Sequence, residues 1–474
     1  MVQQASPVED TAASSRFRLV FAVVAAGVAM SNLDLFVVNV ALPHISGHFH
    51  EASLSSVSWV LNAYAVVFAA LLVPAGSFAD RNGPRRAYLL GVSVFTVASV
   101  LCALAPSVWL LVAARVAQSA GAALLIPASL GILLAAAPPE QRGSAVRNWA
   151  ALGGLAAALG PVVGGALAQA DWRWIFLINV PVGIATVIVG RSAIAPTARR
   201  TESGRSDLLG AALLTAGIGA VALGLVKAPD WGWTSGSPAI TLLAGGVLLA
   251  LFVRRSAKHP VPVLPLQLLR TPAMGPALLA NLLFAAAFAA MLLSAALWCQ
   301  NVWHWSALQT GLAISPGPVM VPLLSKYAGL LVQRFGAAVV AATGSGLFAI
   351  GLFWWIAALS VKEHDYVMGL LPGMVLTGVG VCFTLPTLVG AAVTTVPPAN
   401  FATGSGVVTM ARQTGSVVGV AGLVAVLGKP HGAAAVDAFR HGWIFTLVAT
   451  VAAVAACCLL LPHSRPAAKT DADS

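Results

Sequence analysis

Long apolar stretches recur along this chain, and they limit its possible folds more than any other feature. An α-helix that crosses a bilayer needs about 20 mainly apolar residues. Of the 474 residues, 59% are hydrophobic and only 9% are charged, against about 25% charged in soluble domains. A soluble protein of this composition would lack the polar side chains to cover its surface. The sequence therefore predicts an all-α integral membrane protein.

The apolar stretches give fourteen candidate spans, which fall into three groups. We expect a six-helix bundle over residues 1–195, an inserted two-helix segment with cytoplasmic linkers over 196–272, and a second six-helix bundle with a short cytoplasmic tail over 273–474. The expected spans are residues 17–42, 55–79, 86–105, 107–136, 143–168, 173–195, 207–227, 238–254, 273–299, 307–331, 337–360, 366–395, 403–428 and 442–462.

The formal net charge of +11 admits two interpretations, a nucleic-acid surface or loops that orient a membrane protein. With the N-terminus inside, eighteen Lys and Arg residues fall in cytoplasmic segments and five in outer loops. This is the positive-inside bias of a cell-membrane protein with both termini in the cytoplasm. The basic residues therefore orient the chain and meet lipid headgroups, and no nucleic-acid partner is expected. The five cysteines lack the spacing of a metal site, so no metal is expected either.

A short pattern, G-x-Φ-x-(D/Q)-R-x-G, occurs twice at the ends of spans. GSFADRNGPRR covers Gly76–Arg86 after the second span, and GLLVQRFG covers Gly329–Gly336 after the tenth. The two copies lie 253 residues apart, a separation that holds eight spans: six for one half, and the inserted pair. Parallel six-span repeats, with a substrate site between the halves, are the internal symmetry of major facilitator transporters.

Other stretches make this resemblance specific. The chain resembles the fourteen-span drug:proton antiporters of the major facilitator superfamily, which implies proton-driven export, no cofactor, and function as a monomer. GSFADRNGPRR is similar to that superfamily's signature between spans two and three. The further motifs that resemble the group are LDLFVVNVALP, LLVAARVAQSAGAALLIP, ALGPVVGG, DWRWIFLINVPVG and ARQTGSVVGVA.

Three positions depart from the family pattern. Phe36 stands where a small hydroxyl residue is usual, which leaves the type of substrate open. Ala156 occupies a position that is often glycine, and Gln333 stands where the second copy of the repeat can carry an acid.

Asp34 is the one acidic residue of fifteen that lies deep within a span. At about 1.5 Å per residue it lies roughly 25 Å from the cytoplasmic start of its span, and Arg115 lies roughly 13 Å from the outer start of its own. In a core about 30 Å thick these depths overlap, so the two side chains can face each other or share waters. Asp34 is interpreted as a proton site and Arg115 as the group that tunes it; the alternative is a structural ion pair.

Asp80 and the basic residues beside it form a solvated charge group by default. The resemblance implies that Asp80 docks on a facing helix N-terminus, where the helix dipole favours negative charge, and latches the outward-open state. Gly76 and Gly83 would then permit a close backbone approach. The latch residues are Gly76, Asp80, Arg81, Gly83, Arg85 and Arg86.

The fifth span carries a face of small residues, which let helices pack closely in lipid. By resemblance this antiport face meets a span of the other half and closes the cavity against leak; ordinary packing is the alternative. Its residues are Gly160, Pro161, Gly164 and Gly165. Candidate polar groups of the substrate cavity are Asn62, Tyr64, Gln118, Asn281 and Arg412, the last with either a structural or an anion-binding role.

These observations predict a proton-coupled antiporter that exports drug-like or antibiotic-like amphipathic small molecules by alternating access. The alternative on the same scaffold is an exporter specific for one metabolite or self-made secreted product. An enzyme within the membrane would need a nucleophile, a metal cluster or paired acids at depth, and Asp34 has no acidic partner. A sensor would need a soluble output domain, and no such segment is apparent.

Overall fold

A computed structural model describes residues 7–49, 54–138, 141–196, 207–359, 365–427 and 434–461. Within these ranges the secondary structure is helical, without strands, as the sequence predicts. The N-terminal half contains the helices α1 (Pro7–His48), α2 (Leu54–Asn82), α3 (Pro84–Ala103), α4 (Val108–Ala136), α5 (Arg142–Ala170), α6 (Trp174–Leu177) and α7 (Asn179–Ala193).

The remaining helices follow in the inserted segment and the C-terminal half. The inserted segment forms α8 (Leu208–Trp231) and α9 (Gly236–Ser256). The C-terminal half contains α10 (Met274–Leu297), α11 (Ala307–Ile314), α12 (Pro316–Phe335), α13 (Ala337–Ala358), α14 (Leu371–Val393), α15 (Phe401–Leu427) and α16 (Ala434–Leu460). Four short helical turns connect them: η2 (Leu266–Arg270), η3 (Trp298–Val302), η4 (Tyr366–Leu370) and η5 (Pro398–Asn400).

The predicted count of fourteen spans is not confirmed. Twelve helices in the described ranges are long and apolar enough to cross a membrane. The expected fifth and tenth spans are not among them. The fifth corresponds to α5, and the tenth is divided between α11 and α12, which meet where Pro316 interrupts the backbone hydrogen bonding.

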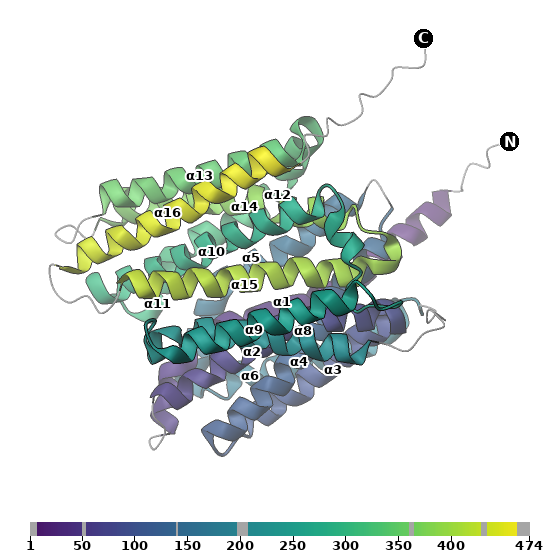
Figure 1. The fold of residues 1–474 in the computed structure, drawn as a ribbon, viewed down its shortest axis with the longest axis horizontal. Coiled ribbons are helices and arrows are strands. Elements are labelled where there is room, and N and C mark those ends of the chain that lie inside the picture. The colour runs from purple at the N-terminus through teal and green to yellow at the C-terminus, as the bar shows by residue number, and fades with distance from the viewer. Residues whose placement is uncertain are drawn as a thin grey trace, which may run out of the picture.

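Each half forms its own helical bundle, and two seams join the halves (Figure 1). In the N-terminal half α1 packs on α5 and α7, and α4 packs on α2 and α3. In the C-terminal half α10 packs on α15 and α16, and α13 packs on α14 and α16. One seam is formed by α2 and α15, and the other by α5 and α12. The inserted helix α8 lies against α2 and α15, so the inserted pair covers the first seam.

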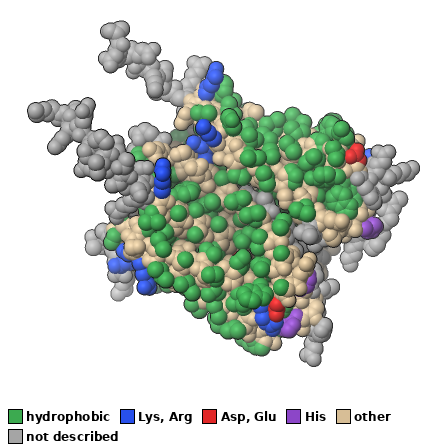
Figure 2. Space-filling model, turned by 180° about the vertical axis from the view of Figure 1, so that it is seen from behind, with side chains coloured by type: hydrophobic (Ala, Val, Ile, Leu, Met, Phe, Trp, Pro, Cys, Tyr) green, Lys and Arg blue, Asp and Glu red, His purple; other side chains and the backbone are tan. Residues whose placement is uncertain are grey.

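The helices run along one common axis, and α1 begins at the same end of the bundle at which α16 finishes (Figure 1). We call this the Asp80 end, because α2 also finishes there, and the opposite one the far end. Hydrophobic side chains cover the middle of the surface, while Lys and Arg gather toward the ends, most of them at the Asp80 end (Figure 2). This distribution is that of a multi-pass membrane protein.

Asp207 links the two helices of the inserted pair, α8 and α9. This carboxylate caps α8 by accepting a hydrogen bond of 2.8 Å from the Gly210 N–H. It also accepts a bond of 2.6 Å from Nε of Arg255, at the end of α9. A buried acid at a helix N-terminus is thus paired both with the helix and with a cation. The start of α8 and the end of α9 are held together at the Asp80 end.

Glycines set the closest helix contacts. A Cβ atom on Gly121 of α4 would lie 2.6 Å from the Phe95 nitrogen of α3, and one on Gly91 would lie 2.7 Å from the Leu125 nitrogen. Real Cβ atoms do not approach backbone so closely. The contact between α3 and α4 therefore depends on the absence of both side chains, as in other close helix pairs in membranes.

We predict that Gly121→Val lowers the unfolding temperature by a few degrees, since overpacking a tight contact costs about 1–3 kcal/mol. Gly246→Val on α9 is the matched control, because a Cβ there meets nothing within 4 Å. Thermal unfolding of the purified variants measures both. Equal unfolding temperatures would contradict the assignment of the α3–α4 contact as backbone-limited.

Candidate functional site

Asp34 lies at the centre of a buried polar network in the N-terminal half. The exposed fraction is 2% for Asp34 and 0% for Arg115. Nη1 of Arg115 donates to Oδ2 of Asp34 at 2.5 Å, so the two form a direct ion pair. The helices α1 and α4 thus bring together the two residues whose depths overlap in the sequence analysis. No water is needed to connect them.

Gln118 and two further residues complete the network. Gln118 accepts from Nη1 of Arg115 at 2.6 Å and donates from Nε2 to Oδ1 of Asp34 at 3.0 Å. Asn179 of α7 also donates to Oδ1 of Asp34, at 3.2 Å. Ser99 of α3 accepts hydrogen bonds from Gln118 at 2.9 Å and from Asn179 at 3.4 Å. The carboxylate is therefore held by three donors from two helices.

The sequence analysis did not single out Asn179 or Ser99. A signal for Asn179 was present, because an amide inside the apolar stretch that follows Trp174 is unusual in the same way as Asp34. Ser99 carried no such signal, since serines are common in spans and often bond their own helix. Ser99 does so too, donating to the Phe95 carbonyl at 2.8 Å.

The rest of the Arg115 side chain contacts α2. Its Nε donates to the Val60 carbonyl at 3.2 Å, and its Cζ lies 4.2 Å from the centre of the Tyr64 ring. A cation over an aromatic face is stabilised most where water is excluded. Nη2 of Arg115 is buried and has no hydrogen-bond partner among the residues that the structure describes. The two N–H groups of Nη2 thus have no acceptor among the described residues, although the atom is buried.

This arrangement compensates the charge of a carboxylate that is buried in the bundle. A buried carboxylate that keeps its charge needs a cation and hydrogen-bond donors, and Asp34 has both. A proton on Asp34 would remove the charge that Arg115 pairs with and leave a buried cation uncompensated. Protonation and the position of Arg115 are therefore tied to each other by electrostatics.

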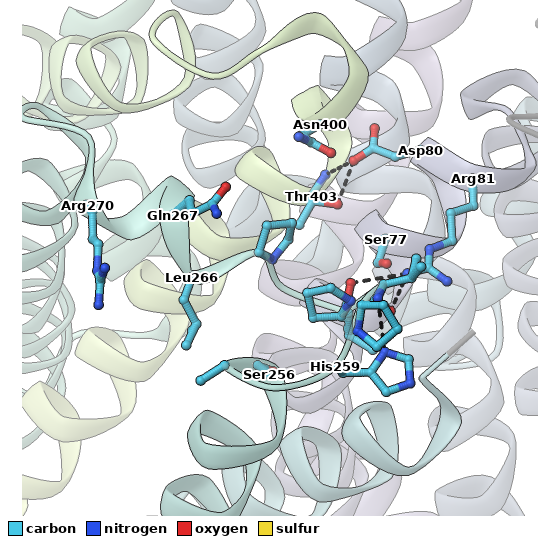
Figure 3. A pocket seen from close by; sticks show the side chains of 16 residues that line it. Ser77, Asp80, Arg81, Ser256, His259, Leu266, Gln267, Arg270, Asn400 and Thr403 are labelled. Carbon is cyan, nitrogen blue, oxygen red and sulfur yellow. Dashed lines mark hydrogen bonds between the residues drawn. The ribbon is translucent and has the colours of Figure 1, made fainter. Parts of the chain in front are cut away.

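Asp80 binds the first turn of a helix in the other half (Figure 3). Its carboxylate accepts from the Ala402 N–H at 3.0 Å, from the Thr403 N–H at 2.7 Å, and from the Thr403 hydroxyl at 2.5 Å. These residues begin α15, so the acid docks on a facing helix N-terminus as the resemblance implies. Thr403 is the partner that the sequence analysis did not name.

The glycines near Asp80 have two different functions. A Cβ on Gly76 would lie 2.5 Å from the Ala402 carbonyl oxygen, so Gly76 does permit a close approach between the halves. Gly83 has a φ of 95°, in the left-handed region, and forms the turn into α3; its expected close approach stays a prediction. Glycine adopts that conformation without strain.

The three arginines of the predicted latch contact different partners. Arg81 donates to the carbonyls of Val261 and Pro262, both at 3.1 Å, and so ties the end of α2 to the linker that follows α9. Arg85 donates to the Arg191 carbonyl at the end of α7. Arg86 is exposed. A cavity of about 510 Å³ lies between Asp80, Arg81 and this linker, with Arg270 and Gln267 on its other side (Figure 3).

The glycines of the small-residue face of α5 have their nearest neighbours in their own half. A Cβ on Gly160 would overlap Phe36, and one on Gly164 would lie 2.9 Å from Cα of Val37. Both neighbours belong to α1, and not to the helix of the other half that the resemblance implies for this face. A stripe of small residues predicts a close helix contact but does not identify the partner helix. Gly165 is half-buried on the same helix, and the side chain of Pro161 lies outside the described residues.

The predicted cavity residues do not all line one site. Tyr64 and Gln118 belong to the Asp34 network. Asn281 is buried and donates to the Val408 carbonyl at 3.0 Å, which joins α10 to α15 within one half. Asn62 is half-buried on α2, and Arg412 is half-buried on α15. No hydrogen bond or ion pair holds the Arg412 guanidinium within the described chain.

Comparisons with known proteins agree with this geometry. Residues 24–420 match the model of the Major Facilitator Superfamily. The multidrug resistance protein Stp of Mycobacterium tuberculosis is 33% identical over 85% of this chain and 74% of its own. The cephamycin export protein CmcT of Amycolatopsis lactamdurans is 32% identical over 88% of this chain and 86% of its own.

One further relative and one solved structure are similar along most of the chain. The methylenomycin A resistance protein of Streptomyces coelicolor is 33% identical over 86% of this chain and 86% of its own. The crystal structure of the human organic anion transporter MFSD10 (TETRAN) superposes with a TM-score of 0.66 at 15% identity, covering 92% of this chain and 99% of that one. At that identity the likeness is one of fold.

We predict that Asp80→Asn weakens the α2–α15 seam, because an amide lacks the charge that a helix N-terminus stabilises by up to about 2 kcal/mol. Maleimide alkylation of Ser405→Cys, a position that is 1% exposed on α15, measures opening. The Cys458→Ser background removes the exposed native thiol. The rate is expected to rise several-fold.

Asp365→Asn is the control for this measurement. Asp365 likewise caps a helical turn, accepting from the Met368 N–H at 2.9 Å, but within a single half. Its alkylation rate at position 405 should equal that of the parent. Equal rates for the two asparagine variants would show that Asp80 does not hold the halves together.

Proposed function

Since this chain belongs to the major facilitator superfamily and is a membrane transporter, we propose that it is a proton-coupled antiporter. It exports drug-like or antibiotic-like amphipathic small molecules across the cell membrane by alternating access. The Asp34–Arg115 ion pair is the observation that carries this proposal. In this proposal the proton gradient is the driving force, so no cofactor takes part, and the two halves of one chain supply both the proton site and the latch, so a monomer suffices.

The proton step follows from the contacts of Asp34. In the charged state its carboxylate is held by Arg115, Gln118 and Asn179. A proton that reaches Asp34 from outside breaks the pairing with Arg115, whose free Nη2 then competes for any acceptor nearby. Release of the proton to the inside restores the pair. In this proposal Arg115 takes one position while it pairs with charged Asp34 and another when Asp34 carries a proton. The two positions favour different packings of α1 and α4.

The conformational step takes place at the seams. The contact of Asp80 with the start of α15 closes the Asp80 end. An inward-facing state requires that these hydrogen bonds break, so Asp80 stabilises the outward-facing one. Arg81 at the end of α2 donates a hydrogen bond to the linker after α9. A movement of α2 at this seam would therefore also move the linker and the inserted pair.

We also propose the topology of this transporter. The Asp80 end, rich in Lys and Arg, is cytoplasmic by the positive-inside rule, and both termini lie on that side. Together with the twelve helices described above, α5 and α12 cross the membrane, since each forms part of a seam between the halves. Fourteen spans would result.

The charges inside the protein narrow the substrate class. The single deep carboxylate is neutralised by Arg115, while Arg412 contributes a cation that has no partner among the described residues. Dications need buried negative charge to offset the loss of hydration. Neutral, monovalent or anionic amphipathic compounds are therefore the better substrates.

A second candidate is export of one self-made product. It is favoured by the names of relatives: a cephamycin export protein and a tetracenomycin C resistance and export protein are both about 32% identical to this chain. Growth of a pump-deficient strain on a panel of toxic compounds separates a broad exporter from a specific one.

We predict that Asp34→Asn abolishes substrate-driven proton movement in proteoliposomes, because an amide cannot take up a proton. Asp171→Asn, which alters an ion pair at the far end, is the control and keeps proton movement. Uphill export by the Asp34→Asn variant, powered by acidity outside, would refute the proton role of Asp34. Substrate binding by the same variant shows that it is folded.

We predict that a neutral dye is exported at least several-fold faster than a dication of similar size. The reason is the unfavourable field of Arg412 and the lack of a free carboxylate. Transport into inverted vesicles, with both compounds at equal concentration, measures the ratio. Arg412→Gln should reduce that ratio, and equal rates in the parent would contradict the charge argument.

A further inference from the structure

The two copies of the sequence repeat form the same backbone at the Asp80 end. Gly83 and Gly336 close the two copies, and both have left-handed φ values, 95° and 83°. Each begins the next helix. The first glycine of each copy lies in close contact with the other half. Gly76 lies against α15, and Gly329 lies against the Arg147 side chain of α5. The seams α2–α15 and α12–α5 are therefore structurally equivalent.

The side chains at the two seams are not equivalent. In the first copy Asp80 supplies a carboxylate to the start of α15. In the second copy the corresponding residue is Gln333, which is exposed. The start of α5 at Arg142 has no side-chain cap. Among the residues that the structure describes, the second seam thus has no carboxylate in the place of Asp80.

In place of a carboxylate, the second seam has a cavity with two cations. Its volume is about 270 Å³, and it is lined by Arg147, Ser144 and Asn148 of α5 and by Lys326 and Gln333 of α12. The residues that line it include no acid. Neither Arg147 nor Lys326 has a hydrogen-bond or ion-pair partner in the ranges that the structure describes. Two cations, two amides and the hydroxyls of Ser144 and Ser325 match an anion with several oxygen atoms.

The surroundings of the cavity indicate where such an anion comes from. On α12, Leu323, Tyr327 and Leu330 are 60%, 57% and 54% exposed. They follow one another at helical spacing, and Leu330 also lines the cavity. An apolar row that leads from the middle of the bundle to a cationic cavity at its end matches a lipid, with acyl chains on the row and a headgroup in the cavity.

We propose that the α5–α12 seam cavity binds the phosphate headgroup of an anionic phospholipid. The phosphate takes the place that Asp80 occupies at the other seam. It bridges Arg147 of one half and Lys326 of the other, since guanidinium and ammonium groups both form charge-assisted bonds with phosphate oxygens. The two seams are then closed by different means. Asp80 closes the α2–α15 seam, which the inserted pair also covers, and a lipid headgroup closes the α5–α12 seam.

Binding of phosphatidylglycerol to the full-length protein in detergent tests this proposal. Native mass spectrometry counts bound lipids, and thermal unfolding reports stabilisation. Phosphatidylglycerol should raise the unfolding temperature more than zwitterionic phosphatidylcholine does. In the double variant Arg147→Gln, Lys326→Gln the count should fall by one, with affinity at that site at least about tenfold weaker.

Arg334→Gln is the matched control, because Arg334 is an exposed cation on the same helix that does not line the cavity. It should bind phosphatidylglycerol as the parent does. Gln333→Asp is a second, independent variant: it restores the acid of the first copy and should reduce lipid binding without removing either cation. An unchanged lipid count in the double variant and in Gln333→Asp would overturn the proposal.

Inorganic phosphate separates the two sources of the anion. At the same concentration as the lipid it should give little of the stabilisation, since it lacks the acyl chains that contact α12. A full effect of inorganic phosphate would overturn the lipid assignment in favour of a free-phosphate site. The unfolding temperature of each variant in phosphatidylcholine shows whether that variant is folded.

Discussion

A charge can remain inside a membrane protein only where another charge and hydrogen-bond donors compensate for lost water, and the pair Asp34–Arg115 meets this condition. The desolvation penalty of each ion is several kcal/mol, so neither group is stable there without the other. Around the pair, α1, α2, α3, α4 and α7 each supply a polar contact. The N-terminal half is therefore organised about a single electrostatic centre, and any change in the charge of Asp34 affects five helices together.

The contacts between the halves are of a different kind. They lie at seams where glycines bring backbones close, and few polar bonds cross them. Asp80 makes three such bonds to the start of α15, all from one side chain. The seam is not held by polar bonds alone, because buried apolar side chains of α2 and α15, such as Leu72 and Val407, belong to one continuous hydrophobic cluster. Separation of the halves at this seam therefore requires that the hydrogen bonds of Asp80 break and that part of this cluster comes apart.

The sequence predicted those features that depend on distance along a helix, and missed those that depend on rotation about it. The rise per residue placed Asp34 and Arg115 at one depth, and their contact followed. Nothing in the spacing showed that Asn179 of α7 points at the same carboxylate. In the same way, the composition of Gly160 and Gly164 predicted a close neighbour, but α1 fills that position, not a helix of the other half. For Asp80 the kind of partner was predicted, a helix N-terminus, and the partner helix was not.

The repeat shows how one backbone can give two different junctions. Gly83 and Gly336 fix the same turn at the same end of the bundle, and the glycines at 76 and 329 admit the opposite half. These glycines set the backbone geometry of both copies. The residue four places after the first glycine of each copy, Asp80 or Gln333, is therefore free to vary. Asp80 makes one junction self-contained. At the other junction Gln333 supplies no charge, and among the described residues Arg147 and Lys326 have no acidic partner, which is why we propose a lipid phosphate there. Under that proposal the α2–α15 seam opens when the hydrogen bonds of Asp80 break, whereas the α5–α12 seam opens when the lipid headgroup leaves, so one repeated backbone gives two junctions that respond to different changes.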